Sequence, residues 1–486
     1  MRTAALPFLL IACLCAGCAT NPVTGGKDLV LMSEKDEIAM GEQVNAQIMQ
    51  QERVYNDIEL QNYVQYVGNK LAQKSHRPNL NYRFTVLDSK EVNAFALPGG
   101  HIYVTRGLLS YLNSEAELAA VLGHEIGHVT ARHAVRQHSA TQLTSIGAAI
   151  GSAFIPGVGQ AGYQLAGVLG ETLLRGYGRE HELEADRLGA EYLARTGYDP
   201  DAMLAVIGAL KSQELLEFRL AREEGREPRV YHGLFSTHPD NDTRLQEIVA
   251  NASQVTPVQN PFVGRNDYMQ RVNGLVYGEG TGQGIVKGRD FYHGGLGFAM
   301  RFPQAWAINN LSDRLIAVAP GNGAYLQVTL TRVDPKSSPQ DFFAAKMGIE
   351  RLGNEQALSI HGLPAHTGTA PVNTGEGQRL ARLTVIQMGN RAFVLVGLTP
   401  NSGAFSRYDG AFVDTARTFR PLTRAEREFA SKEQRVRTFV ANDKTTFANL
   451  AQTSPIEKFP EEQIRLINGR YPRGDIRPGE VMKTVQ

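Results

Sequence analysis

Cysteine is almost absent from this chain. The 486 residues include three cysteines, Cys13, Cys15 and Cys18, and the sequence after Cys18 has none. No intrachain disulfide can therefore support the folded part of the protein, and no thiolate there can bind a metal. Any metal site in that part must use histidine and carboxylate ligands.

An excess of charge of one sign is also absent. The chain has 50 basic and 49 acidic residues, which gives a formal net charge of +1 with neutral histidines. This balance does not indicate a nucleic-acid partner. Hydrophobic residues make up 42% and charged residues 20%, which is typical of a globular protein. A chain of 486 residues is too long for one compact core, so we expect two to four domains.

The chain also lacks an uninterrupted hydrophobic run of membrane-spanning length. Its most apolar long stretch, residues 146–170, is interrupted by Pro156 and seven glycines. A membrane-spanning helix needs about 20 predominantly apolar residues. The stretch therefore predicts a packed helical hairpin or a mobile lid, and a membrane span is the less favoured alternative.

Residues 1–17 have the features of a signal peptide, with Arg2 followed by a short apolar segment. The next residues, Leu14–Cys18, resemble a bacterial lipobox, in which the final cysteine carries the lipid. We therefore predict a lipid on Cys18, a tether over residues 18–32 and a periplasmic protein anchored to the outer membrane. Two alternatives are lipidation of Cys13 and an ordinary cleaved signal.

Two helices carry the candidate functional residues. Ser114 and Glu117 have the spacing of a capping box, which predicts a helix from Ser114 to about Gln137. A second helix is predicted over residues 179–195, because Gly197 and a nearby proline form a stop signal.

The segment His124–His128 has the pattern H-E-x-x-H within the first of these helices. Residues four apart lie about 40° apart around a helix, so both imidazoles can reach one metal ion. Glu125 lies beside that face and can act as general base toward a water that zinc activates. We predict one Zn²⁺ per chain, bound by His124 and His128. Two surface histidines without a metal are the alternative.

A catalytic zinc needs a third protein ligand. His133 would lie about 140° around a continuous helix from His128, which places it behind the ligands or at the surface. On the second helix, Glu182 and Asp186 are four apart. One can bind zinc while the other orients a ligand histidine, whereas Glu184 points elsewhere. Spacing alone does not separate Glu182 from Glu184.

Together these segments resemble the Ste24/HtpX-type metallopeptidases, the M48 family of gluzincins. The resemblance covers most of residues 20–250 and implies that Glu182 is the third zinc ligand, supported by Asp186. The clear spans of integral-membrane members are missing, so the chain resembles the soluble periplasmic branch. The matching segments, in order, are Asn93–Ala96, Pro98–Gly100, His124–His128, Glu182–Asp186, 237–239 and Arg244.

The same resemblance implies roles for further residues. In the family, the segment matching Asn93, Ala94, Phe95 and Ala96 is an edge strand along which the substrate lies as an added strand. An ordinary buried strand is the alternative. His238 and Arg244 match a segment whose members can stabilise the oxyanion of the tetrahedral intermediate. His238 can instead cap the open zinc position, or only cap a helix.

The fold class expected from these features is multidomain. A mainly α-helical gluzincin-type protease domain with a small edge-exposed β-sheet is expected over residues 33–255, followed by a linker over 256–284. Residues 285–421 are predicted to form an α+β domain, which resembles PsbP and Mog1.

Residues 422–486 are predicted to form a connector and a small βααβ module that resembles LysM, which implies a peptidoglycan contact. The usual Gly-Asp-Thr of that module is replaced by Asp443-Lys444-Thr445, so a structural cap is an equal alternative.

The function implied by the resemblance is a zinc-dependent endopeptidase of the bacterial envelope. It would hydrolyse unfolded or misassembled envelope proteins, which it would bind as extended chains. The alternative is a chaperone-like outer-membrane assembly factor that binds extended clients with little cleavage. The presence of Glu125 favours the enzyme.

Overall fold

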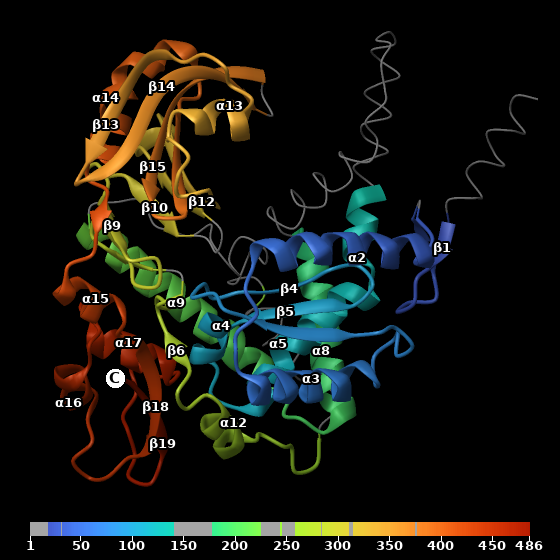
Figure 1. Cartoon of the computed structure of the whole chain (residues 1–486). Helices are drawn as coiled ribbons and strands as arrows, with labels where there is room; N and C mark the ends of the chain where they lie inside the picture. Colours follow the sequence, from blue (N-terminus) through green and yellow to red (C-terminus); the bar gives the residue numbers. More distant parts are fainter. Residues whose placement is uncertain are drawn as a thin grey trace, which may run out of the picture. The chain divides into compact units, whose positions relative to one another are not determined.

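The chain forms two compact units. The first contains the residues up to Tyr277 together with Arg435–Gln486, and the second contains Gly278–Gln434 (Figure 1). The computed structural model describes residues 18–30, 32–139, 177–224, 244, 258–282, 284–310, 314–374 and 377–486. The predicted signal peptide, the apolar stretch 146–170 and His238 lie outside these residues. No helix in the described ranges has the length and apolar character needed to cross a bilayer.

A small three-stranded sheet lies at the centre of the first unit. Its strands are β3 (Arg83–Leu87), β4 (Ala94–Ala96) and β5 (His101–Thr105), in the order β3-β5-β4. Strand β3 is parallel to β5, and β4 is antiparallel to it. Glycine is required in the β4–β5 turn, because Gly99 and Gly100 adopt φ angles of 83° and 105°. The turn brings β4 back along β5 as an antiparallel neighbour.

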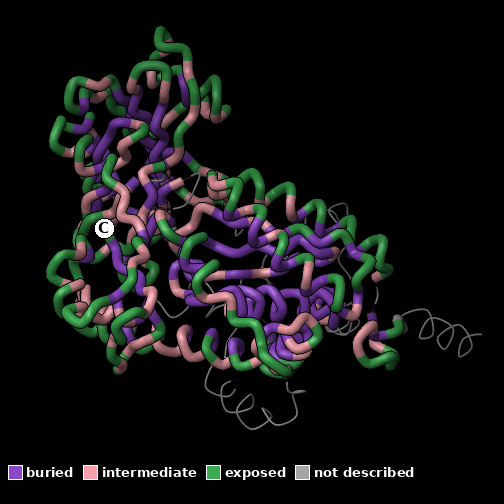
Figure 2. The backbone as a smooth tube through the Cα atoms, turned by 90° about the horizontal axis from the view of Figure 1, so that it is seen from below, coloured by how far each residue is buried: buried purple, intermediate pink, exposed green. Residues whose placement is uncertain are grey.

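Helices cover both faces of this sheet. Side chains alternate along β5: Tyr103 packs with residues of α2 (Glu34–Gln51), whereas Ile102 and Val104 join a core with α3 (Ile58–Ala72) and α5 (Glu115–Thr130). Figure 2 shows the sheet and the helices packed against it as the most buried part of the unit. The sheet therefore supports α5 from a fully packed face.

Helix α5 begins where the sequence predicts but ends earlier. The Ser114 hydroxyl accepts from the N–H of Glu117, and the Glu117 carboxylate accepts from the N–H of Asn113 at 2.8 Å. The helix ends at Thr130 instead of Gln137, because Arg132 has a left-handed φ of 56°, and helical residues resume at position 133. The break at Arg132 changes the direction of the helical residues that follow it.

The second functional helix, α8 (Arg179–Thr196), packs against α5 and is followed by α9 (Ala202–Glu224). As predicted, Gly197 ends α8 with a φ of 79°. The two helices approach closely through small residues. A Cβ atom on Gly127 would lie 3.0 Å from the backbone oxygen of Ala185. Larger residues here would separate the faces that carry the histidines and Glu182.

The C-terminal residues belong to the first unit. They form β18 (Gln434–Val440), α16 (Phe447–Thr453), α17 (Pro460–Ile467) and β19 (Val481–Val485), which is the predicted βααβ order. Strands β19 and β18 continue to β6 (Val276–Tyr277) in one sheet. Their apolar side chains join the same core as α5. The compact units therefore cut across the predicted segment 422–486.

Lys483 links this C-terminal strand to the start of α5. Its side chain is fully buried, and Nζ donates to the backbone oxygens of Ser110 and Leu112, both at 2.7 Å. These carbonyls lie at the end of α4 (Arg106–Tyr111), just before the Ser114 cap. Burial lowers the pKa of Lys483 well below its usual value.

Two predicted connecting segments contain regular structure. The predicted tether contains a two-stranded sheet of β1 (Cys18–Thr20) and β2 (Lys27–Leu29), which a short local turn brings together. The predicted linker contains α12 (Arg265–Arg271), whose Tyr268 side chain is buried in the core of the first unit.

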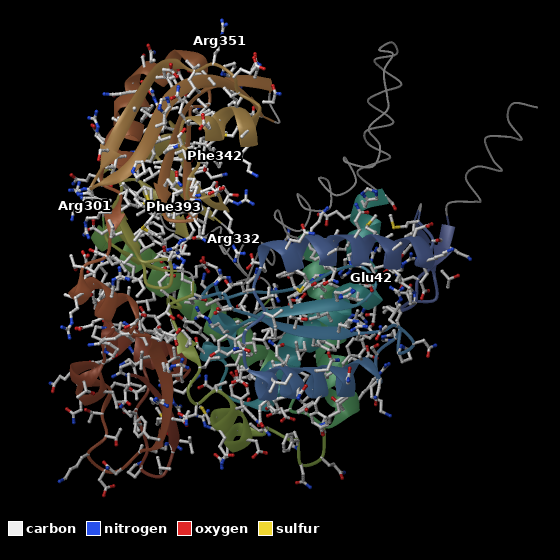
Figure 3. The ribbon with its side chains drawn as sticks, in the orientation of Figure 1. Glu42, Arg301, Arg332, Phe342, Arg351 and Phe393 are labelled. Carbon is white, nitrogen blue, oxygen red and sulfur yellow. The ribbon has the colours of Figure 1, made fainter. Side chains whose placement is uncertain are left out.

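The second unit is rich in β-structure, with helices packed on its sheets. A seven-stranded sheet has the order β10-β11-β12-β16-β15-β14-β13, and a four-stranded sheet has the order β17-β9-β8-β7. The core of the unit combines aliphatic residues with phenylalanines: Phe393 lies within it (Figure 3) and contacts Phe298 and Phe419, with ring centroids 4.7 Å away in both cases. Both strands and helices are present, as expected for an α+β domain.

The elements of this unit have the following bounds: β7 (Ile285–Lys287), β8 (Asp290–His293), β9 (Phe298–Arg301), β10 (Ala307–Asn310), β11 (Arg314–Val318), η2 (Pro320–Asn322), β12 (Tyr325–Arg332), α13 (Asp341–Met347), β13 (Gly353–Ile360), β14 (Leu363–Thr374), β15 (Gly377–Met388), β16 (Arg391–Leu398), η3 (Ser402–Ala404), α14 (Phe405–Arg417), β17 (Arg420–Pro421) and α15 (Arg424–Ala430).

Candidate metal centre

Helices α5 and α8 bring His124, His128 and Glu182 together. The Nε2 atoms of the two histidines lie 3.0 Å apart. The Glu182 carboxylate faces both rings: Oε2 lies 3.5 Å from Nε2 of His124, and Oε1 lies 3.5 Å from Nε2 of His128. All three side chains are buried. The structure thus joins the two predicted histidine ligands to the carboxylate that the sequence resemblance selected.

Asp186 lies directly behind His124, as expected. Its Oδ1 atom is 2.7 Å from Nδ1 of His124, so Nε2 of the same ring faces the cluster. Arg244 donates to both Asp186 oxygens at 2.7 Å and lies 3.3 Å from Glu182. Burial opposes ionisation of Asp186, but Arg244 and His124 hold the pKa of this carboxyl below its usual value.

These contacts suit a metal-binding role. Donor atoms of His124, His128 and Glu182 all lie within 4.8 Å of one another. Two imidazoles and one carboxylate form a donor set known from catalytic zinc sites of proteases. The carboxylate–histidine contact of Asp186 is the usual support of such a ligand. The residues present therefore fit a metal ion.

The second histidine is supported by His133, which lies behind a ligand, one of the two positions that the sequence predicted for it. Nδ1 of His128 lies 2.8 Å from Nδ1 of His133, and Nε2 of His133 lies 3.0 Å from Glu184. Burial lowers the pKa of His133. Glu184 is half-buried and also accepts from Arg136 at 2.9 Å; as expected, it is not among the donor atoms of the cluster, but it is held in place by His133 and Arg136.

Two more residues complete the surroundings of the cluster. The Tyr177 ring stacks on His128, with centroids 4.1 Å apart and planes inclined by 19°. Burial and the nearby carboxylates of Glu125 and Glu182 raise the pKa of Tyr177. Glu125 is buried on α5, and its charge also acts on Arg244. No sequence motif indicated Tyr177, which lies outside the recognised segments.

The predicted substrate strand has the expected place in the sheet. Strand β4 pairs with β5 on one side and is an edge strand among the described residues. Asn93 precedes it, and its N–H donates to Thr105 at 3.1 Å. Ala94 and Ala96 are buried, whereas Phe95 is partly exposed. A substrate-binding role of this segment stays a prediction, and so does every role of His238.

An H-E-x-x-H helix facing a glutamate from a second helix defines the metal centre of a metallopeptidase. Residues 59–252 match peptidase family M48. This part of the chain, which holds the whole cluster, therefore belongs to peptidase family M48.

Curated relatives of the chain are proteases as well. A beta-barrel assembly-enhancing protease of Yersinia pestis is 29% identical over 67% of this chain and 71% of its own length. The protein of the same name from Escherichia coli (strain K12) is 28% identical over 75% of each chain. The mitochondrial metalloendopeptidase OMA1 of Schizosaccharomyces pombe is 31% identical over 38% of this chain and 51% of its own.

Solved structures give weaker matches. PsbP from Synechocystis sp. PCC 6803 covers 30% of this chain and 98% of its own, at 14% identity and a TM-score of 0.22. Mog1p of Saccharomyces cerevisiae covers 29% of this chain and 99% of its own, at 10% identity and a TM-score of 0.22. The PsbP/Mog1-like fold of residues 285–421 stays a prediction.

Proposed function

We propose that the protein is a zinc-dependent endopeptidase of the bacterial envelope that hydrolyses unfolded or misassembled envelope proteins. One observation carries this proposal: the buried cluster of His124, His128 and Glu182 lies beside Glu125 in an M48 domain. The two bacterial relatives described above are named as proteases that enhance β-barrel assembly. Their name supports envelope proteins as the substrate class.

His124, His128 and Glu182 would hold one Zn²⁺ ion. When bound, zinc would polarise the scissile carbonyl and lower the pKa of the attacking water. Glu125 would accept the proton of that water and deliver it to the leaving amine. Asp186 keeps His124 in the orientation that aims Nε2 at the cluster. Arg244 compensates the buried charges of Asp186 and Glu182, which supports a positioning role for this arginine.

Substrate binding would use the free edge of β4. A polypeptide in extended form can add a strand there through backbone hydrogen bonds, which depend little on its sequence. A folded protein seldom offers such a segment, so this mode selects unfolded clients. The adjacent packing of β4 and α5 would place the added strand near the metal centre.

The N-terminal sequence supports a proposal for the location. We propose that a lipid on Cys18 anchors the protein to the outer membrane, with the protease unit in the periplasm. The C-terminal βααβ segment would contact peptidoglycan if it acts as a LysM module. His238 would cap the metal or stabilise the oxyanion, and its replacement by alanine would raise basal cleavage in the first case and lower it in the second.

A substitution of the general base tests the proposal. Glu125→Gln removes the base and leaves all three metal ligands, so we expect bound zinc but no cleavage of a chemically unfolded substrate such as reduced casein. Glu180→Gln is the matched control, because Glu180 is exposed in the first turn of α8. Cleavage at the wild-type rate by the Glu125 variant would refute the mechanism.

The same assay separates the enzyme from the chaperone-like assembly factor. A purified wild-type protein that binds unfolded substrate but does not cleave it, with zinc present, would favour the assembly factor. Repeated turnover by the wild type, lost in Glu125→Gln, would favour the protease.

A further inference from the structure

His128, the second histidine of the H-E-x-x-H motif, has a support of its own that is separate from Asp186. Asp186 contacts His124, whereas His133 contacts His128. His128 directs Nε2 toward His124 and Glu182, which leaves Nδ1 for the contact with His133. Because two ring nitrogens meet there at 2.8 Å, one must donate and the other must accept.

One assignment of protons satisfies the whole chain of contacts. If Nε2 of His128 is a metal ligand, its Nδ1–H donates to Nδ1 of His133. The neutral His133 ring then carries its proton on Nε2 and donates it to Glu184 at 3.0 Å. Glu184 is fixed from another direction by Arg136. The hydrogen bonds from His128 through His133 to Glu184 therefore each join one donor to one acceptor.

The backbone break after α5 makes this contact. In a continuous helix His133 would lie about 140° around the axis from His128. The left-handed Arg132 turns the chain, so the His133 ring instead meets His128 with centroids 4.9 Å apart. A left-handed conformation is unfavourable for a residue other than glycine, so it needs support.

Ion pairs supply this support. Arg132 Nε donates to Glu37 at 2.8 Å, and Arg132 Nη2 donates to the backbone oxygen of Met32 at 3.1 Å. Arg77 binds the other oxygen of Glu37 at 2.8 Å and also donates to the carbonyl of Val129 at 3.0 Å. Glu37 and both arginines are buried. The first turn of α2 thus fixes the end of the helix that carries the histidines.

We propose that His133 and Glu184 are positioning residues that orient His128 for metal binding, through a relay made possible by the left-handed Arg132. This inference rests on the proposed function, because it takes His128 as a zinc ligand. Neither residue touches the substrate or the reacting atoms. Their role is to fix the ring of His128 and the tautomer that exposes Nε2 to the metal.

The test measures zinc affinity by competition with a chromogenic chelator, on the purified protein without substrate. His133→Leu removes the acceptor for His128, and we expect zinc affinity to fall about 10- to 100-fold. His133→Asn places an amide oxygen near the original Nδ1 position, so it should recover much of that loss. Glu184→Gln keeps an acceptor for His133, so its zinc affinity should be closer to that of the wild type than the zinc affinity of Glu184→Leu.

A matched control and a spectroscopic measurement complete the design. His366→Asn replaces a buried histidine of the second unit, which packs near Phe343, and should leave zinc affinity unchanged. In the cobalt-substituted protein, His133→Leu should shift the visible d–d bands, whereas His133→Asn should restore them. A variant that merely loosens packing would not be rescued in this way.

The outcomes separate this inference from the proposed function. A wild-type chain that binds no zinc contradicts both. A wild-type chain that binds zinc and cleaves peptides, with equal zinc affinity in His133→Leu, overturns the relay alone. Equal losses in His133→Leu and His133→Asn also overturn it, because the acceptor at Nδ1 would then be irrelevant.

Discussion

The two compact units bury charged side chains to different extents. The first unit encloses ionised groups near its metal centre, among them Glu37 between two arginines and Asp186 beside Arg244. The core of the second unit is built from phenylalanines and aliphatic residues. Buried charges are expensive to desolvate and must be paired, whereas apolar packing stabilises a fold without such partners.

This difference separates an interior that carries the candidate metal site from one that consists mainly of apolar packing. The cluster in the first unit requires carboxylates and imidazoles at fixed distances. The charged residues around it therefore both orient these side chains and balance their charges. Among the described residues, a group of side chains able to hold a metal ion occurs only in the first unit. Changes in the first unit should therefore affect metal binding and stability together.

The largest expected effect comes from breaking the buried network around Glu37. Glu37→Ala leaves Arg77 and Arg132 buried without their shared carboxylate, which should cost the first unit about 3–5 kcal/mol. Chemical denaturation, monitored through the release of zinc, would measure this loss in the free energy of unfolding. The control Glu34→Ala removes a mostly exposed partner of Arg77, 3.6 Å away, and should have little effect. Similar effects in the two variants would contradict the role of burial.

A comparable change in the second unit should leave catalysis intact. Phe393→Ala removes a buried ring from a cluster of aromatic side chains, which should destabilise that unit by about 3 kcal/mol. Peptide hydrolysis and zinc content should remain at wild-type levels below the unfolding temperature of the second unit. Loss of zinc in this variant would remove the functional distinction between the two units.

A substitution of Lys483 tests whether the C-terminal strand β19 stabilises the start of α5. Lys483→Met fills a similar volume but leaves the carbonyls of Ser110 and Leu112 without their donor. We expect a loss of about 1–3 kcal/mol in the first unit. Lys444→Met, in an exposed turn, is the control. Unchanged stability of Lys483→Met would show that these contacts are dispensable.

The smallest effect concerns an ion pair at the surface of the second unit. Arg420 lowers the pKa of Glu426 to about 2 through a two-pronged hydrogen bond. The folded pKa is depressed, so the pair stabilises the unit above the unfolded pKa, and this contribution disappears as pH falls from about 4.5 toward 2. Because the pair lies at the surface and is only partly buried, solvent screens it, and Glu426→Gln should cost less than about 1 kcal/mol at neutral pH. Melting curves of both proteins should converge at low pH; a constant difference would contradict the prediction.

Local sequence signals predicted the parts of the site that depend on local geometry. The Ser114 cap fixed where α5 begins, and four-residue spacing placed His124 and His128 on one face. Gly197 ended α8, as glycine in a left-handed C-cap allows. Selecting Glu182 over Glu184 needed the family resemblance, because both glutamates lie on the same helical turn.

Tertiary contacts decided the features that sequence reasoning missed. Nothing around Arg132 is glycine or proline, so the break in the helix depends on Glu37, which is distant in sequence. The long hairpin of β13 and β14 also went unpredicted, because much of β13 is exposed and its sequence has little apolar alternation. The C-terminal segment joined the first unit through apolar packing that has no local signal.

Metal analysis of two neighbouring variants tests the central claim most directly. Zinc per chain is measured by atomic spectroscopy after purification of the wild type, Glu182→Ala and Glu184→Ala. The account predicts one zinc per chain in the wild type, most of that amount in Glu184→Ala, and almost none in Glu182→Ala. Zinc in Glu182→Ala equal to that in the wild type would exclude Glu182 from the ligands and contradict the proposed centre.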